Sequence, residues 1–286
     1  MAKLNEEFSF TGSIGKLSVY QMKGVDKPVV RRKGGPSKKK VSEGENFENT
    51  RRRNSEFGGR AAVSGWIMRA LHHHKRLADY NIAGPLNVLM MPIQEMDMST
   101  HRGQRPILLS ANPEILKGFS LNRGTSFDTI VKTALEYRFE GNKASILIPA
   151  LVPAINFSPS SRYPWFRIIV ALGLVPDLIF MKGGLPIDPD YDSFSDPQSK
   201  RWRFSYEPAH PDYERFYGAP NEVGTSWFPV KKGMPSVMLD VDLGGVPPAN
   251  DHTLILSVGI QYGNQLEIDV IEEAPYAGAA KILAVR

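Results

Sequence analysis

The chain of 286 residues contains no cysteine. This absence excludes disulfide bonds, zinc sites with cysteine ligands and thiol catalysis. Long apolar runs are also missing: the longest, 146–155 and 168–176, are far shorter than the ~20 residues that span a bilayer. The first residues lack the apolar segment of a secretory signal, so we expect a cytoplasmic protein by default, with signal-independent export or incorporation into a particle left open.

Motifs that commit a chain to a reaction are absent as well. No Gly-x-Ser-x-Gly elbow precedes an expected helix, and Gly12–Lys16 is too short for a phosphate-binding loop. Asp240 and Asp242 share one face of an expected strand, where a solvated polar face explains them as well as a pair of catalytic carboxylates does. We therefore expect no enzymatic activity, no catalytic residue and no cofactor.

Two sequence features resemble metal sites without completing one. The triplet His72–His74 places successive side chains about 100° apart on a helix and offers no i, i+4 histidine pair, so it favours a polar helix end. Residues 188–196 have the alternating aspartates of a calcium loop, but Ser193 stands where that loop has glycine and Ser199 where it has glutamate. We expect a solvated loop and no metal site, with calcium binding left undecided.

Positive charge is concentrated near the N-terminus. Residues 1–76 hold 17 Lys and Arg against 7 Asp and Glu, a net charge of +10, whereas the whole chain carries +5. Residues 77–286 therefore sum to −5, and this split predicts a basic attachment element joined to a separate scaffold. The candidates for docking or for phosphate contact are Lys16, Lys23, Lys27, Arg31, Arg32, Lys33, Lys38, Lys39 and Lys40.

The basic stretch has three interpretations. Cations on a β-ribbon can follow a phosphate backbone, dock on an acidic protein surface, or keep an exposed strand edge soluble. No recognised nucleic-acid-binding signature accompanies them. Residues 16–40 hold nine Lys and Arg against Asp26 alone, whereas Arg51–Arg53 lie among glutamates. The ribbon and linker are thus the expected docking arm, and the helix that follows is expected to pack on the body.

The hydrophobic pattern predicts a ribbon, then helices, then strands. Short strands are expected at 8–10, 17–22 and 29–32, followed by one bent helix or two helices in series from about 45 to 81 and a further helical piece at 86–98. The expected apolar stripe of the long helix is Phe57, Ala61, Ser64, Met68 and Leu71, widened by Trp66 and Ile67. After Pro106 the pattern indicates nine or ten strands, of which 254–262 alternates most regularly.

Aromatic side chains gather between residues 165 and 227. Trp202, Phe204 and Tyr206 alternate with polar residues and are expected in the core. Tyr213, Phe216, Tyr217 and Trp227 lie in loops rich in proline and glycine and are the surface aromatic candidates. Exposed rings of this kind suit a platform that binds sugar or protein.

Several stretches resemble a family of uncharacterised Bacteroidota proteins. They are Gly12–Gly24, Arg31-Arg32, Phe47–Arg52, Arg102–Pro106, Leu116–Arg123 and Tyr276–Lys281. In that family a Gly-Lys ribbon and a Lys-Gly turn precede a helix that opens with Thr and Arg. The resemblance implies a bacterial or phage-related source and a build of helix plus sandwich, and it transfers no catalytic residue.

Together these observations predict a mainly β protein: a basic β-ribbon arm and linker over 1–44, a helical segment over 45–100 and an antiparallel β-sandwich over 101–286. The expected function is that of a non-enzymatic structural protein that self-associates or docks through its arm, as in a filament, a surface appendage or a phage particle. Its expected partner is itself, as a homo-oligomer or polymer, or an acidic protein surface, without membrane insertion. Two alternatives stay open: a nucleic-acid-associated protein and a carbohydrate-binding β-sandwich.

Overall fold

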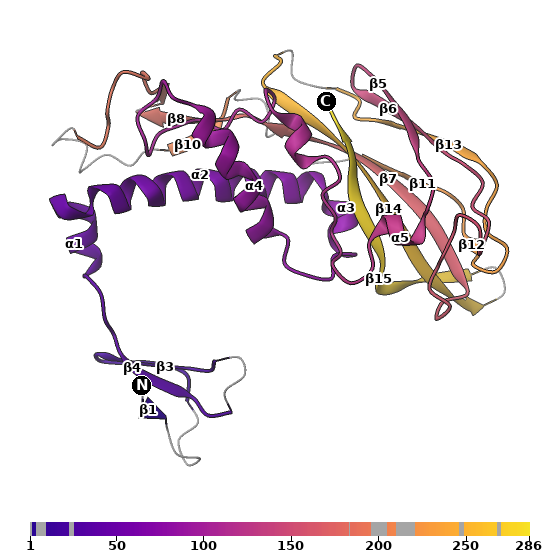
Figure 1. Cartoon of the computed structure of the whole chain (residues 1–286), viewed down its shortest axis with the longest axis horizontal. Coiled ribbons are helices and arrows are strands. Elements are labelled where there is room, and N and C mark those ends of the chain that lie inside the picture. Colours follow the sequence, from indigo (N-terminus) through magenta and orange to yellow (C-terminus); the bar gives the residue numbers. More distant parts are fainter. Residues whose placement is uncertain are drawn as a thin grey trace. The chain divides into compact units, whose positions relative to one another are not determined.

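The computed structural model describes residues 2–3, 10–22, 26–182, 184–195, 205–209, 221–245, 249–267 and 270–286 (Figure 1). The chain is mainly β, with 38% strand against 24% helix, and its sheets are antiparallel. Two compact units follow one another, Met1–Arg51 and Arg52–Arg286. The three domains expected from the sequence stay a prediction.

The first unit contains a small four-stranded sheet. Its strands are β1 (Ala2–Lys3), β2 (Gly12–Ile14), β3 (Leu17–Tyr20) and β4 (Val29–Arg32), in the order β1-β4-β3-β2. The turn between β2 and β3 contains Gly15 at a φ of 53°, a conformation that favours glycine. A short helix, α1 (Lys38–Glu43), follows, with the Ser37 side chain accepting a hydrogen bond from the Lys40 amide. The ribbon expected at 17–22 and 29–32 is confirmed, and most of the strand expected at 8–10 lies outside the described residues.

Helices open the second unit. After the short 3-10 turn η1 (Glu45–Phe47), α2 (Glu48–Ala70) ends at Leu71 and is continued by α3 (His72–Lys75), so two helices in series are confirmed. Next comes α4 (Ala83–Met96), which contains Pro92. None of the described helices combines the length and the apolar character needed to cross a membrane.

The apolar stripe expected on the long helix is wrong at Phe57 and Ala61, which are exposed, and correct at Ser64 and Leu71, which are buried. Phe57 is 58% exposed, and the buried face instead consists of Arg52, Glu56, Gly59, Val63, Ser64, Ile67 and Ala70. The first residues of this face are two ion-paired charges and a glycine. Hydrophobic periodicity does not count such residues as buried, so it could not predict this part of the face. Gly59 is buried because Phe180 packs where its side chain would be: a Cβ there would lie 3.2 Å from the Phe180 ring.

The strands of the second unit form three sheets. The largest has the order β11-β7-β14-β15, with β12 also pairing with β7, and the others are β13-β6-β5 and β10-β8-β9. Two short helices, η2 (Pro113–Leu116) and α5 (Phe127–Ile130), precede the strands. The strand bounds are β5 (Glu136–Glu140), β6 (Lys143–Ile148), β7 (Trp165–Pro176), β8 (Leu178–Lys182), β9 (Leu185–Pro186), β10 (Ser205–Pro208), β11 (Asn221–Gly224), β12 (Phe228–Pro229), β13 (Val237–Asp242), β14 (His252–Glu267) and β15 (Val270–Val285).

The centre of the largest sheet, residues 168–176 of β7 and 253–263 of β14, is buried on both faces. Alternate residues of its long strands, such as Val170 and Val258, belong to a hydrophobic cluster shared with β6 and β13. The intervening residues, such as Val175 and Ile255, belong to a second cluster shared with α2 and α4. Double burial explains why β7 and β14 are almost continuously apolar, since neither face meets water.

Small residues let the helices approach this sheet closely. A Cβ on Gly173 of β7 would lie 2.6 Å from the Ala70 Cβ and 2.8 Å from the Ala70 carbonyl oxygen. A Cβ on Gly259 of β14 would lie 2.5 Å from the His74 ring. Real side chains do not tolerate such distances, so glycine at both positions sets the separation between the helix layer and the sheet.

Candidate functional sites

The basic side chains expected to form a docking arm lie on the surface of the first unit. Eight of the nine candidates are exposed: Lys16, Lys27, Arg31, Arg32, Lys33, Lys38, Lys39 and Lys40. Lys23 lies outside the described residues. The Arg31 guanidinium sits 5.2 Å from the centre of the Tyr20 ring on the neighbouring strand, a cation–π contact that holds this cation against the sheet.

The sheet of the first unit has very little core. Among the described residues 10–22 and 26–51, only Val19 and Val29 are buried. Two larger apolar side chains at the end of the ribbon, Ile14 and Leu17, are 60% and 46% exposed. Short strands with one or two buried side chains are marginally stable in water, so this sheet has apolar and hydrogen-bonding surface left to cover.

Charge follows the division into units. Residues 1–51 hold 11 Lys and Arg against 6 Asp and Glu, whereas residues 52–286 hold 24 of each. The net charge of +5 therefore belongs entirely to the first unit. The boundary of the basic element lies at the end of this unit, because Arg52, Glu56 and Arg60 of the following helix have partners inside the second unit.

The run Arg51–Arg53 illustrates this boundary. Arg51 Nη1 donates hydrogen bonds to the carbonyls of Val41 at 3.1 Å and Gly44 at 2.7 Å, and so holds the link between α1 and α2. Arg52 is buried and belongs to the second unit, while Arg53 is exposed. Three consecutive arginines that look alike in the sequence thus have three different environments.

The acidic loop at 188–196 is tied to the helix by an ion pair. Arg52 Nη2 donates to Asp192 Oδ2 at 2.5 Å, and Arg52 Nη1 donates to the Arg102 carbonyl at 2.8 Å. Burial raises the pKa of Asp192, but hydrogen bonds from Arg52 and Ser195 outweigh it and lower the pKa to about 2. The expectation of a solvated loop is wrong at Asp192. The described residues contain no cluster of metal-binding side chains, and Asp196 lies outside them.

A second ion pair lies one turn further along α2. Arg105 Nε donates to Glu56 Oε1 at 2.7 Å, and the Gly103 amide donates to the same oxygen at 2.9 Å. Burial raises the pKa of Glu56, but the Arg105 hydrogen bond and the Gly103 amide together lower it. Gln94 of α4 accepts from Arg60 Nη1 and donates to the Arg105 carbonyl. This network joins α2, α4 and the loop after α4. Because all these polar groups are paired with one another, we assign the network a role in stabilising the fold.

His74 is the most deeply buried titratable side chain described. It is fully buried between α3 and the sheet, with Nδ1 2.9 Å from Ser257 Oγ and Nε2 3.1 Å from the Ile169 carbonyl oxygen. Burial lowers the pKa of His74 to about 4, so the ring is neutral at pH 7. The polar helix end expected for His72–His74 is wrong for His74, since only His72 is exposed and His73 is half-buried. The three histidines thus differ in exposure, and the absence of a metal site at the triplet stays a prediction.

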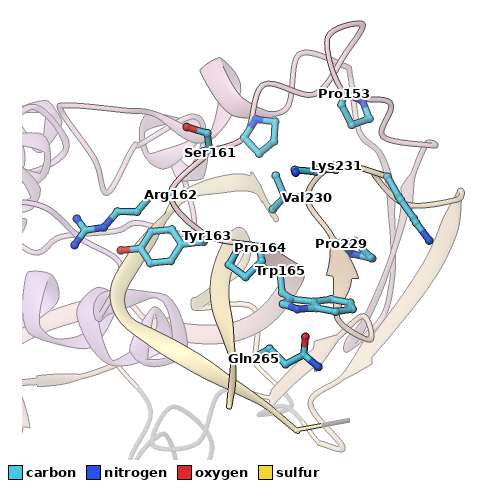
Figure 2. Close-up of a pocket in the computed structure, with 12 residues that line it drawn as sticks. Pro153, Ser161, Arg162, Tyr163, Pro164, Trp165, Pro229, Val230, Lys231 and Gln265 are labelled. Carbon is cyan, nitrogen blue, oxygen red and sulfur yellow. The ribbon is translucent and has the colours of Figure 1, made fainter. Parts of the chain in front are cut away.

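The pocket with the most distinctive chemistry lies where β7 begins. It has a volume of about 720 Å³, and we call it the Trp165 pocket. Figure 2 shows Tyr163, Pro164 and Trp165 following one another along one side, with Val230 and Lys231 across from them. The other residues that line it are Pro153, Pro159, Ser161, Arg162, Pro229, Lys232 and Gln265. Neither an aspartate nor a glutamate is among these twelve residues.

A second hollow adjoins the Trp165 pocket through Pro159 and Tyr163, which line both. Its volume is about 420 Å³. Hydroxyl groups dominate its lining, which consists of Thr125, Ile130, Ser158, Pro159, Ser160, Tyr163, Tyr262 and Gly278. The two rings of Tyr163 and Tyr262 stack at 5.4 Å with an angle of 16° between their planes. We call this second site the hydroxyl hollow.

The surface aromatic candidates do not gather in one described patch. Trp227 is half-buried and packs beneath Arg167, whose guanidinium carbon lies 5.0 Å from the centre of the indole. Tyr213, Phe216 and Tyr217 lie outside the described residues. The sugar- or protein-binding platform expected from these four residues therefore stays a prediction.

The two strand aspartates have separate partners. Asp240 Oδ1 accepts a hydrogen bond from Ser145 Oγ at 2.6 Å, and Asp242 forms an ion pair with Lys143 at 2.8 Å. Both partners lie opposite them on β6. This cross-strand pairing favours the solvated polar face over a pair of catalytic carboxylates.

The sequence reasoning missed the Trp165 pocket and the burial of His74. A signal for the pocket was present, because residues 159–165 alternate prolines, serines and aromatic rings around Arg162. A signal for His74 was the run of small and polar residues Ser257, Gly259 and Gln261 on one face of β14, which makes room for a side chain from the helix layer. Searches against protein-family models, curated proteins and solved structures found no significant match to this chain.

Proposed function

We propose that this chain is a non-enzymatic structural protein that assembles by docking its basic N-terminal unit on a partner, with a second copy of the chain as the expected partner. The observation that carries the proposal is the unfinished sheet of the first unit. Its described part buries only Val19 and Val29 and exposes Ile14 and Leu17, and the unit to which it belongs, residues 1–51, holds all of the net positive charge. A sheet of this kind gains stability when another surface covers it.

The exposed residues of the N-terminal unit indicate what kind of surface it would dock on. The exposed cations call for an acidic surface, and Ile14 and Leu17 call for apolar contact beside it. The outer face of β13-β6-β5 offers both, because Glu136, Glu140 and Asp240 line a shallow hollow of about 350 Å³ together with the exposed side chain of Met238. The same hollow contains Arg138, which pairs with Glu140 and leaves an acidic excess.

Charge reversal in the full chain tests this proposal. The variant Arg31→Glu/Arg32→Glu/Lys33→Glu is compared with the natural chain by size-exclusion chromatography with light scattering. We expect the natural chain to assemble and the variant to elute as a folded monomer. Deleting residues 1–44, which leaves α2 whole, has the same expected result. Lys132→Glu, an exposed cation of the second unit, is the control and leaves assembly unchanged.

The same proteins test the nucleic-acid alternative, which the exposed cations around Tyr20 also support. A gel shift at low and at moderate salt is measured with a random duplex. The nucleic-acid alternative replaces the assembly proposal if two results are found together. The natural chain is a monomer, and it binds the duplex with an affinity that falls steeply with salt and is lost in the triple variant. Normal assembly of the truncated chain refutes docking through the arm.

We further propose that β5–β15 form a β-sandwich. Support comes from the cluster that the sheets β13-β6-β5 and β11-β7-β14-β15 share, in which Ile146 and Val241 of one sheet join Val170 and Val258 of the other. Two sheets that pack face to face in this way lie about 10 Å apart. An experimental structure that measures this separation is the test. Carbohydrate binding by such a sandwich is the third candidate function of the chain.

A further inference from the structure

We propose that the Trp165 pocket and the hydroxyl hollow together bind an anionic oligosaccharide, a sugar chain that carries carboxylate or phosphate groups. This site lies in the second unit and is independent of the assembly proposed above. Three properties carry the inference: the charge of the pocket, the flat apolar faces within it, and the hydroxyl groups that continue from it.

The charge of the pocket selects an anion. Arg162, Lys231 and Lys232 line it, and no carboxylate is among its lining residues. All three cations are exposed, and the residues 52–286 around them are neutral as a whole. A pocket whose described lining holds three cations and no carboxylate attracts a ligand that supplies the negative charge.

The walls of the pocket fit a ring. Trp165 and Tyr163 are half-buried, so each presents part of its ring to the opening, and Pro153, Pro159 and Pro229 add flat apolar surfaces. Figure 2 shows the Trp165 ring between Pro229 and Gln265. Aromatic rings pack well against the C–H faces of sugars, while the Gln265 amide and the Ser161 hydroxyl are suited to sugar hydroxyls.

The adjoining hollow extends this pattern. Thr125, Ser158 and Ser160 contribute hydroxyl groups, which both donate and accept hydrogen bonds, as sugar hydroxyls do. Tyr163 lines both spaces and therefore lies where one sugar unit would follow another. A combined space of about 720 Å³ and about 420 Å³ suits more than one ring, which favours an oligosaccharide over a single sugar.

The pocket is held in place by backbone pairing. Trp165 is paired with Pro229 of β12 on one side and with Gly263 of β14 on the other. The Lys232 and Gly233 amides both donate to the Pro229 carbonyl, which forms a tight turn that presents the two lysines. Gly233 has a φ of 73°, and a Cβ there would lie 1.9 Å from the Leu151 carbonyl oxygen, so the turn requires glycine. A preformed site loses less entropy when a ligand binds.

Isothermal titration of the full chain tests the proposal with four defined probes. They are trigalacturonate, the neutral sugar maltotriose, glucose 6-phosphate and adenosine monophosphate. We expect trigalacturonate to bind at least 10-fold more tightly than maltotriose. Comparison of glucose 6-phosphate with trigalacturonate shows whether the pocket prefers a phosphate or a carboxylate. The sugar that binds more tightly identifies the preferred anionic group.

Two variants and one control locate the site. Lys231→Gln/Lys232→Gln should weaken the anionic sugars about 10-fold while changing maltotriose less than 2-fold, because only the charge is removed. Trp165→Ala should weaken both kinds of sugar, and a circular dichroism melt verifies that it folds. Lys132→Gln, an exposed cation elsewhere, should change nothing.

Three results would overturn the proposal. These are binding of maltotriose as tight as that of both anionic sugars, no heat of binding from either anionic sugar at millimolar concentration, and binding of adenosine monophosphate that is tighter than that of both anionic sugars. None of these results depends on the assembly state, so refuting sugar binding is distinct from refuting assembly through the docking arm.

Discussion

His74 Nδ1 lies 2.9 Å from Ser257 Oγ, although 183 residues separate the two along the chain. The other ring nitrogen faces the Ile169 carbonyl, which only accepts hydrogen bonds, so Nε2 carries the proton and Nδ1 accepts from the serine hydroxyl. One imidazole thereby connects α3 to β7 and to β14. Because the ring is fully buried, this connection holds only while the histidine is neutral.

Removal of the His74 side chain is expected to destabilise the fold. His74→Ala leaves a cavity between the helix layer and the sheet and removes one hydrogen-bond partner each from the Ser257 hydroxyl, which keeps the Ala171 carbonyl as acceptor, and from the Ile169 carbonyl. We expect a loss of about 2–4 kcal/mol in the free energy of unfolding, measured with urea. His72→Ala, an exposed neighbour, is the control with an expected change within about 0.5 kcal/mol. Equal effects of the two substitutions would contradict the connecting role.

Acid is expected to weaken the fold through the same residue. The pKa of His74 is about 4 in the folded chain against an ordinary 6.5, so the unfolded chain binds a proton first as the pH falls. The stabilisation is complete above pH 6.5 and is lost between about pH 6.5 and pH 4. Between pH 7 and pH 5 we expect a loss of about 2 kcal/mol in the natural chain.

The matching variant isolates this contribution. In His74→Asn no imidazole titrates at this position, so the same change of pH should cost about 2 kcal/mol less than it does in the natural chain. Urea unfolding of both proteins at the two pH values gives the difference. An identical pH dependence in the two proteins would show that other groups, such as the half-buried His252, account for it.

The Glu56–Arg105 pair supports a further prediction. Glu56→Ala leaves the Arg105 guanidinium, which is 13% exposed, without its carboxylate, and it also orphans the Gly103 amide. We expect a loss of about 3 kcal/mol in the free energy of unfolding, as is typical when one partner of a buried pair is removed. Lys143→Ala, which breaks the exposed pair with Asp242, should cause no measurable change.

Two glycines should respond in opposite directions to the same substitution. Gly65 lies inside α2, and no atom lies within 4 Å of the place that a Cβ would take, so Gly65→Ala should stabilise the protein by about 0.5–1 kcal/mol. At Gly173 a Cβ meets the backbone of Ala70, so Gly173→Ala should lower the melting temperature by several degrees. Thermal melts of both variants measure the difference, and a stable Gly173→Ala protein would contradict the close approach of helix and sheet.

Local patterns in the sequence were sufficient to predict several of the elements. Alternation at 254–262 predicted a strand that appears as β14, and the helical pattern from about 45 to 81 predicted a stretch that appears as α2 and α3. These signals work because period and turn chemistry act over a few neighbouring residues. The buried face of α2 could not be predicted in the same way, because Arg52 and Glu56 are buried only through partners 140 and 49 residues away along the chain.

The candidate sites also differ in whether local sequence is enough to predict them. The basic arm is a property of composition, and the exposure of its described cations agrees with it. The Trp165 pocket joins residues from 153–165, 229–232 and 265, so no local window contains it.

By itself, the sequence determined the absence of cysteine chemistry, the order of ribbon, helices and strands, and a strongly basic N-terminal element. The tertiary structure decided which charges are paired. It assigned the whole net charge to the first unit, buried His74 but not its neighbours His72 and His73, and brought Lys231 and Lys232 to the pocket that Trp165 lines. The physical reason is that burial and pairing depend on distances between remote residues, which are set only when the helices pack on one face of the central sheet and β6 and β13 pack on the other.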